Sequence, residues 1–232
     1  MYIERKNNMI EVKNLSVRYQ EGDQAFLALK DIQLTFPDSG FISIVGRSGS
    51  GKSTLLNAMG GLGKPTEGAI IYNHENIYQK TDKELAKYRS ENIGYIFQEF
   101  YLENTFTVYQ NVEIALMVTK YPRNKRKEKI YSLLEKVGML EKCNVNVGKL
   151  SGGEKQRVCI ARALINGNSV ILADEPCGNL DSYHGDIVMK LLGDLSKEGK
   201  LVVLVTHNLE DAKKTNRMIE LRDGIVIKDE NI

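Results

Sequence analysis

Alternating apolar and polar residues open the chain. The apolar positions of this stretch are Ile10, Val12, Leu15 and Val17. A period of two predicts a β-strand with one buried face, so we expect an antiparallel edge strand that ends at Tyr19, followed by more strand over residues 25–36. Residues 37–40, with the sequence Pro-Asp-Ser-Gly, predict a turn, and residues 41–45, four of which are apolar, then predict a buried strand.

The period changes in the middle of the chain. Residues 69–72 and 93–97 predict strands and residues 81–90 predict a helix, and the second of these strands stops at Gln98. From residue 98 to 167 the apolar residues follow helical spacing instead. One such apolar stripe consists of Ile130, Leu133, Leu134 and Val137. We interpret this part as an inserted α-helical subdomain.

Strand and helix alternate again in the last part of the chain. The continuous apolar residues 170–173 and 201–205 predict strands buried on both faces, as in a parallel sheet. The apolar stripe of the helix between them consists of Ile187, Val188, Leu191, Leu192 and Leu195. We therefore predict a single domain over residues 1–232. Its α/β core consists of residues 1–97 and 168–232, and its helical subdomain consists of residues 98–167.

Composition narrows the class of protein. The 232 residues are 42% hydrophobic and 27% charged, which is typical of a soluble globular domain. The 32 basic and 30 acidic residues leave a net charge of only +2, so we expect no nucleic-acid partner. Cys143, Cys159 and Cys177 are odd in number and widely spaced, which predicts a reducing compartment and neither disulfides nor a zinc site.

Membrane and export signals are not expected. The charged segment Met1 to Asn8 is not followed by the apolar run of a signal peptide. No window approaches the roughly 18–20 apolar residues of a membrane-spanning helix. We therefore expect a chain that does not cross a membrane alone.

A phosphate-binding motif lies between the apolar residues 41–45 and the next helix. Its sequence is Gly46-Arg47-Ser48-Gly49-Ser50-Gly51-Lys52-Ser53-Thr54. This is a complete G-x-x-x-x-G-K-[ST] loop in the strand-to-helix context that the motif requires. Glycines let the backbone wrap around a polyphosphate, the backbone N–H groups attract the anion and Lys52 adds a positive charge, while Ser53 is expected to ligate magnesium. The predicted fold class is therefore α/β, with a P-loop NTPase core and an antiparallel β edge.

A second anion site is predicted further along the chain. The stretch is Leu150-Ser151-Gly152-Gly153-Glu154, and an apolar-periodic helix follows it. A serine and two glycines at a helix N-terminus offer open N–H groups and a hydroxyl donor to an anion. The same residues are also typical of an ordinary helix cap, and the stretch alone does not separate these two interpretations.

Together with the P-loop, this signature stretch resembles the ATP-binding-cassette (ABC) ATPases over nearly the whole chain. Tyr19 matches the family's adenine-stacking aromatic residue, and Gln98 ends a strand as the family's glutamine does. Asp174 and Glu175 resemble the Walker B acidic pair, Gly178-Asn179-Leu180-Asp181 resembles the D-loop, and His207 resembles the switch histidine. These elements occur in the family's order.

The resemblance implies a role for each of these residues. Ser53, Gln98 and Asp174 would hold Mg²⁺, which requires oxygen ligands and keeps several waters. Glu175 would polarise the attacking water as a general base, and His207 and Gln98 would help to position that water at the γ-phosphate. The cofactors implied are ATP and Mg²⁺.

The resemblance also implies a homodimer. In the family, the signature lies far from its own P-loop and completes the ATP site of a second subunit in a head-to-tail pair. Ser151, Gly152 and Gly153 would contact the partner's nucleotide, and Asp181 would cross the interface. ATP binding and hydrolysis would then close and open that interface.

Several stretches resemble one subgroup of these ATPases, which serves lipoprotein release, macrolide or peptide export, antimicrobial-peptide resistance and the bacterial division complex. These stretches are residues 60–62, 65–68, 93–98, 107–112 and 174–181. The resemblance implies an ATPase subunit at the cytoplasmic face of the cell membrane that powers a separate integral membrane permease for lipids, peptides or antimicrobials. Cys177 departs from the threonine or serine usual in the family.

Two other functions remain open on sequence. One is a regulatory cassette protein of a membrane complex, as in cell division, that transports nothing. The other is a soluble cassette protein that acts on ribosomes, DNA or iron–sulfur assembly; the ribosome type usually carries two cassettes in one chain and the DNA type a long coiled-coil insertion, and this chain has neither.

Two further segments allow two interpretations each, and two histidines have no predicted function. The basic residues 123–129 fit contact with anionic lipid or with a membrane partner, or simply a solvated start of a helix. The apolar and aromatic residues within 100–106 fit a docking groove or the core of the helical subdomain. His74 and His184 have no partner at ligand spacing and are expected at the surface.

Overall fold

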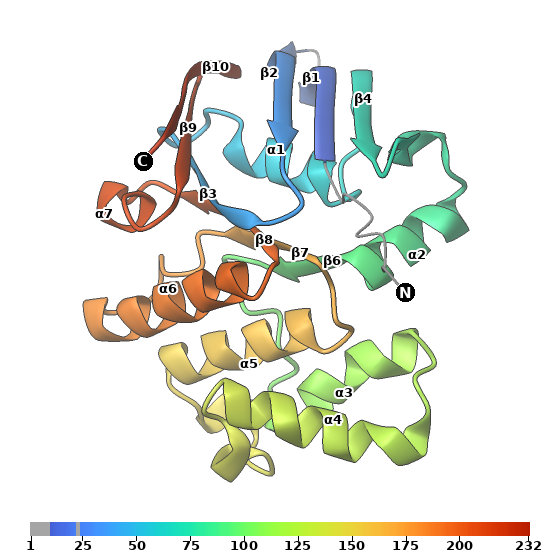
Figure 1. The fold of residues 1–232 in the computed structure, drawn as a ribbon, viewed down its shortest axis with the longest axis vertical. Coiled ribbons are helices and arrows are strands. Elements are labelled where there is room, and N and C mark those ends of the chain that lie inside the picture. The colour runs from blue at the N-terminus through green and yellow to red at the C-terminus, as the bar shows by residue number, and fades with distance from the viewer. Residues whose placement is uncertain (1–9, 22–23) are drawn as a thin grey trace, which may run out of the picture.

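The computed structural model describes residues 10–21 and 24–232. The charged segment Met1 to Asn8 lies outside the described residues. Helix α1 (Lys52–Met59) contacts strands of two different sheets, and three helices gather at the opposite end of the molecule (Figure 1). The nucleotide-binding motif is therefore built where the two sheets meet.

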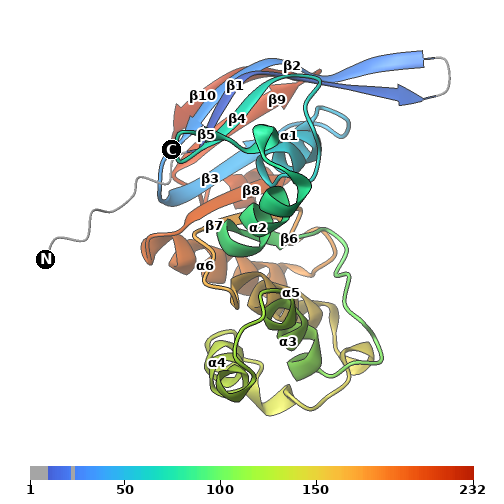
Figure 2. The same cartoon turned by 90° about the vertical axis from the view of Figure 1, so that its right-hand side faces the viewer.

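The first sheet is antiparallel and has the strand order β2-β1-β4-β5. Its strands are β1 (Ile10–Glu21), β2 (Gln24–Phe36), β4 (Glu67–Tyr72) and β5 (Glu75–Asn76). The prediction of an edge strand was wrong for β1, which is paired on both sides by β2 and β4. Alternation reports one buried face of a strand but carries no information about pairing at its edges. Figure 2 shows β1 and β2 reaching out beyond the rest of this sheet.

The second sheet has the order β10-β9-β3-β8-β7-β6 and is mainly parallel. Its strands are β3 (Gly40–Val45), β6 (Ile93–Ile96), β7 (Val170–Asp174), β8 (Leu201–Thr206), β9 (Arg217–Arg222) and β10 (Ile225–Asn231). Strands β3, β8 and β7 are neighbours, so the P-loop, Asp174 and His207 all follow carboxyl ends at one edge of the sheet. Strand β9 was not predicted, because only Ile219 and Leu221 of its residues are buried.

Helices α3 (Val108–Val118), α4 (Arg123–Lys136) and α5 (Gly152–Leu164) form the helical end of the molecule in both ribbon views (Figures 1 and 2). The predicted stripe on α4 is buried at Ile130 and Leu134. Helix α5 also contacts β6 and α6 (Ser182–Lys197), which joins this end to the second sheet. Helices α2 (Asp82–Asn92) and α7 (Leu209–Ala212) and the 3-10 turns 77–79, 140–142 and 147–149 complete the described elements. The predicted α/β class with an antiparallel sheet and added helices is confirmed.

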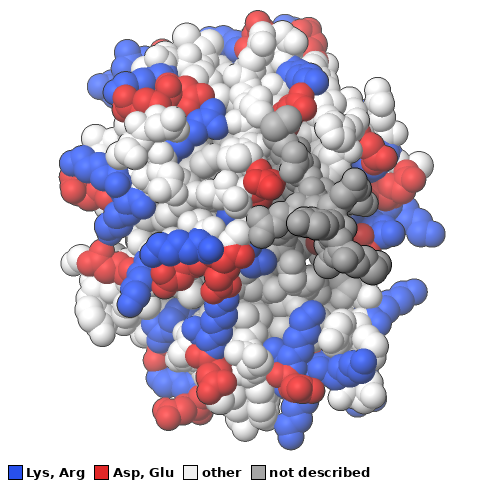
Figure 3. Space-filling view, in the orientation of Figure 1, with Lys and Arg blue, Asp and Glu red and all other residues white. Residues whose placement is uncertain are grey.

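The basic residues 123–129 form the first turns of α4. Arg126 lies 3.5 Å from the carboxylate of Glu113 and donates a hydrogen bond of 3.0 Å to the backbone oxygen of Tyr121. Basic and acidic side chains are intermingled over much of the face shown in Figure 3. Among the described residues, no helix combines the length and apolar character needed to span a membrane.

Candidate functional site

The P-loop wraps around the start of α1 through glycines with left-handed backbone angles. Gly46, Gly49 and Gly51 have φ angles of 152°, 78° and 100°. A Cβ on Gly51 would lie 2.5 Å from the backbone oxygen of Ala28, so strand β2 abuts the end of the loop. Gly51 is the N-cap of α1 and supplies no side-chain cap, which leaves the first N–H groups of the helix available to an anion.

Two polar side chains of the loop, those of Lys52 and Ser50, are buried. The Lys52 ammonium group is buried and donates hydrogen bonds of 2.9 and 2.8 Å to the backbone oxygens of Gly46 and Arg47. Burial lowers the pKa of Lys52, and the nearby carboxylates of Glu175 and Asp174 oppose that shift. The hydroxyl of Ser50 is also buried and has no hydrogen-bond partner within the described residues. The Lys52 ammonium group and the free N–H groups at the start of α1 fit a polyphosphate.

Ser53 and Asp174 bring two oxygen ligands together. The Ser53 hydroxyl donates a 3.0 Å hydrogen bond to the Asp174 carboxylate at the end of β7. Burial raises the pKa of Asp174, and the bond from Ser53 opposes this. A bound cation would offset the cost of burying that carboxylate. The donor set fits Mg²⁺, which takes its remaining oxygen ligands from phosphate and water.

Glu175 and His207 form a close pair beside the P-loop. Nδ1 of His207 lies 2.6 Å from a carboxylate oxygen of Glu175. The Glu175 backbone is left-handed, with φ 47°, and its N–H donates to the backbone oxygen of Val205 at 2.9 Å. An unfavourable backbone angle outside glycine is typical of functional positions whose surroundings hold them in place. The carboxylate is thereby directed to the same cavity as the P-loop.

Two aromatic rings also line this cavity. It has a volume of about 710 Å³ and is lined by Tyr19, Phe26, most of the P-loop, Gln98, Glu175 and His207. Tyr19 and Phe26 are directly paired across β1 and β2, with ring centroids 5.7 Å apart at 40°. Phe26 was not predicted as a site residue, although cross-strand pairing with Tyr19 in the expected hairpin was a signal that could have found it.

The signature residues lie elsewhere. Ser151 is the N-cap of α5, and its N–H donates to the Glu154 carboxylate at 3.0 Å while the Glu154 N–H donates to the Ser151 hydroxyl at 3.4 Å. Glu154 also forms an ion pair with Lys142. Ser151, Gly152 and Gly153 are not among the described residues that line the P-loop cavity. Within one chain, the structure therefore brings the P-loop and Walker B residues together and keeps the signature apart.

The family is decided by comparison with known proteins. The ABC transporter family matches residues 29–178 of the chain. The chain belongs to this family. It is 42% identical over 222 residues to the macrolide export ATP-binding/permease protein MacB of Shewanella sp. (strain ANA-3), covering 96% of this chain and 34% of that protein. The chain therefore spans about a third of the length of MacB.

Two further relatives are similar over their whole length. The uncharacterized ABC transporter ATP-binding protein YvrO of Bacillus subtilis (strain 168) is 41% identical over 222 residues, covering 96% of this chain and 97% of YvrO. The dimeric structure of MJ0796, a bacterial ABC transporter cassette, superposes with a TM-score of 0.89 at 41% identity over 96% of this chain and 98% of that one. A dimeric post-hydrolysis structure of MJ0796 bound to ADP and Pi gives a TM-score of 0.88 at 38% identity, with the same coverage of 96% and 98%.

The D-loop of this cassette touches two other motifs. The side-chain amide of Asn179 donates a 3.4 Å hydrogen bond to the backbone oxygen of Gln98. The Leu180 side chain lies against Gly152, where an added Cβ would be 3.5 Å away. As predicted, His74 lies at the surface; the ring of His184 is only partly exposed and is bonded to Asp181.

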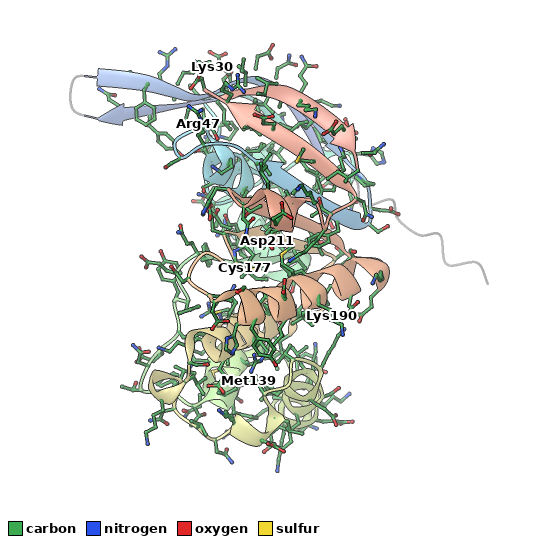
Figure 4. The ribbon with its side chains drawn as sticks, turned by 90° about the vertical axis from the view of Figure 1, so that its left-hand side faces the viewer. Lys30, Arg47, Met139, Cys177, Lys190 and Asp211 are labelled. Carbon is green, nitrogen blue, oxygen red and sulfur yellow. The ribbon has the colours of Figure 1, made fainter. Side chains whose placement is uncertain are left out.

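Cys177 lines a second cavity of about 350 Å³, beside α6 and α7. Its thiol lies 3.6 Å from the backbone oxygen of Gly185. Burial raises the pKa of Cys177 to about 12, with a further contribution from Asp211, so the thiol stays neutral. Figure 4 labels Cys177 and Asp211 beside α6, and Arg47 of the P-loop below the β1 and β2 strands.

Proposed function

We propose that this cassette binds and hydrolyses MgATP and thereby powers a separate integral membrane permease. The observation that carries the proposal is that the P-loop donors, the Glu175–His207 pair and an aromatic pair all line one cavity. That arrangement provides a place for the base, the polyphosphate and the attacking water.

Each residue has a chemical task in this proposal. The α1 N–H groups and Lys52 bind the phosphates, and Lys52 exchanges its bonds to the loop carbonyls for bonds to phosphate oxygens. Glu175 accepts a proton from the attacking water as a general base, and His207 orients that carboxylate. Mg²⁺ would neutralise charge on the phosphates, with Ser53 and Asp174 as its protein ligands and Gln98 at the edge of the site.

We infer that the active form is a homodimer. The signature turn presents a serine and two glycines at a helix N-terminus but does not line the P-loop cavity of its own chain. A second copy in head-to-tail arrangement would bring Ser151 and Gly153 to the γ-phosphate. The dimeric form of the similar cassette MJ0796 supports this arrangement.

Two observations support a permease partner: the name of a similar protein and exposed apolar residues on α3. MacB is named as an ATP-binding/permease protein for macrolide export, and we propose an exporter or mechanotransmission partner for lipids, peptides or antimicrobials at the cytoplasmic face of the cell membrane. Ile114, Met117 and Val118 on α3 are exposed apolar residues, and Val118 lines a groove of about 680 Å³ next to α2. The groove itself is lined mainly by polar and charged residues, so we assign the docking of a partner helix to the exposed apolar residues of α3.

A pull-down of tagged Glu175→Gln protein from detergent-solubilised membranes tests this proposal. The substitution removes the general base but leaves the phosphate donors, so the ATP-bound dimer should accumulate with MgATP. We expect a multi-span membrane protein to co-purify with this variant and not with Lys52→Ala, the matched control that cannot hold the phosphates. Recovery of soluble partners alone, with the wild-type ATPase intact, would contradict the permease; a small partner that transports nothing would indicate a regulatory complex instead.

A further inference from the structure

His184 holds the carboxylate of Asp181 at the start of α6. Asp181 is the N-cap of this helix and accepts a 2.9 Å hydrogen bond from the backbone N–H of His184. Nδ1 of the same residue lies 2.9 and 2.8 Å from the two carboxylate oxygens, so the ring donates from Nδ1. These two bonds lower the pKa of Asp181, the backbone bond having the larger effect. The exposed carboxylate is thus fixed in direction by two donors from one residue.

The opposite part of the His184 ring lies against the signature. A Cβ added to Gly153 would be 2.4 Å from Cδ2 and 2.6 Å from Cγ of His184. Contacts under 3 Å leave no room for any side chain at position 153 while the ring is in place. Gly153 is buried, and Leu180 lies beside the neighbouring Gly152. The D-loop and the signature turn are therefore in contact within one chain, with His184 between Asp181 and Gly153.

We propose that His184 is a positioning residue that holds Asp181 at a set distance from the signature turn, so that both motifs meet a second copy as one rigid surface. The inference rests on the proposed function, in which these two motifs complete the partner's ATP site. Two loops that are already ordered lose less conformational entropy when the dimer closes, and misplacement by about 1 Å lowers catalysis strongly. His184 acts through Asp181 and Gly153 and touches no reacting atom in its own P-loop cavity.

Two substitutions of similar shape separate the hydrogen bond from the packing. In His184→Asn, the amide nitrogen replaces Nδ1 and the amide oxygen replaces Cδ2, so both the bond and the contact with Gly153 remain. In His184→Leu, two methyl groups occupy the same places without a donor. His74→Asn, at an exposed position with φ 66° that asparagine tolerates, serves as the control.

The test measures ATP turnover, ATP-driven dimerisation in the Glu175→Gln background, and binding of a fluorescent ATP analogue to dilute monomer. We expect His184→Leu to lower kcat and dimer affinity roughly five- to tenfold, less than the loss of a whole charged hydrogen bond because the backbone N–H of residue 184 still holds Asp181, with analogue binding to the monomer unchanged. His184→Asn should stay within about twofold of wild type, as should His74→Asn.

Four results would overturn the inference. Turnover of His184→Leu equal to that of wild type would show that the bond has no positioning role. Equal losses in the Asn and Leu variants, or a loss of analogue binding by the Leu monomer, would indicate a general effect on folding. A wild-type protein that neither pairs nor hydrolyses ATP would overturn the proposed function, and this inference with it.

Discussion

The starts of helices α1 and α5 carry similar residues but are built in opposite ways. The N-cap of α1 is a left-handed glycine without a side-chain cap, and the neighbouring Ser50 hydroxyl is buried with no hydrogen-bond partner among the described residues. The N-cap of α5 is Ser151, whose capping box with Glu154 occupies the helix end. One helix start is open and the other is closed by its own chain.

The difference indicates where each helix start finds its ligand. The α1 end leaves its first N–H groups without a side-chain cap, and an anion in the cavity of the same chain would satisfy them. The α5 end is stable alone, and the Ser151 hydroxyl accepts from Glu154 but keeps its own proton to donate. The capped start of α5 is thus stable without a ligand and can still donate a hydrogen bond to a phosphate bound by a second subunit.

The largest effect is expected at the open helix. Lys52→Ala removes the buried charge from the P-loop, and we expect ATP turnover to fall by about 10²–10³-fold, because one donor to the developing charge is lost. Binding of the fluorescent ATP analogue to the monomer should fall as well. Retained analogue binding would mean that the phosphates sit elsewhere.

A substitution at the capped start of α5 should affect ATP turnover only in the dimer. We expect Ser151→Ala to lower turnover about ten- to a hundredfold, the size of one hydrogen bond to a charged phosphate, with analogue binding to the monomer unchanged. Mixing this variant with Glu175→Gln should raise activity above that of either alone, because the mixed dimer pairs an intact P-loop with an intact signature. No rise on mixing, with both variants folded and dimeric, would contradict a shared site.

A smaller effect is expected at the base end of the open site. Phe26 is 51% exposed and pairs with Tyr19 at the cavity mouth, so Phe26→Ala should weaken ATP binding by about three- to tenfold through lost stacking. Binding of inorganic tripolyphosphate, which has no base, should not change. Equal losses for both ligands would show that the substitution disturbs the P-loop instead.

The smallest effect is expected on the stability of the fold, from the Lys142–Glu154 pair at the start of α5. The hydrogen bond from Lys142 holds the pKa of Glu154 below its ordinary value, so this pair stabilises the fold above the unfolded pKa of about 4.3 and the effect is lost as pH falls below that value. Glu154→Gln keeps a capping box but removes the ion pair, and should cost about 0.5 kcal/mol at pH 7. Thermal unfolding should show this difference shrinking toward pH 3, and a constant difference would contradict the ion pair.

Elements that show a clear apolar pattern within one continuous segment could be predicted from the sequence. Strands β7 and β8 contain continuous apolar runs and β3 is mainly apolar, and the P-loop joins β3 to α1. Contacts between distant segments were not predictable in the same way. Ala28 against Gly51 and His184 against Gly153 depend on how sheets and helices pack, and periodicity reports only which face of one element is buried.

The aromatic pair at the cavity mouth also has a spectroscopic use. The sequence contains 11 tyrosines and no tryptophan, so Tyr19→Trp would introduce a single indole fluorophore against a tyrosine background. Tyr19 is 41% exposed and stands beside Phe26, where a bound base would change the solvent around the indole and quench its emission. The β1–β2 strands would then report the arrival and departure of each nucleotide in real time.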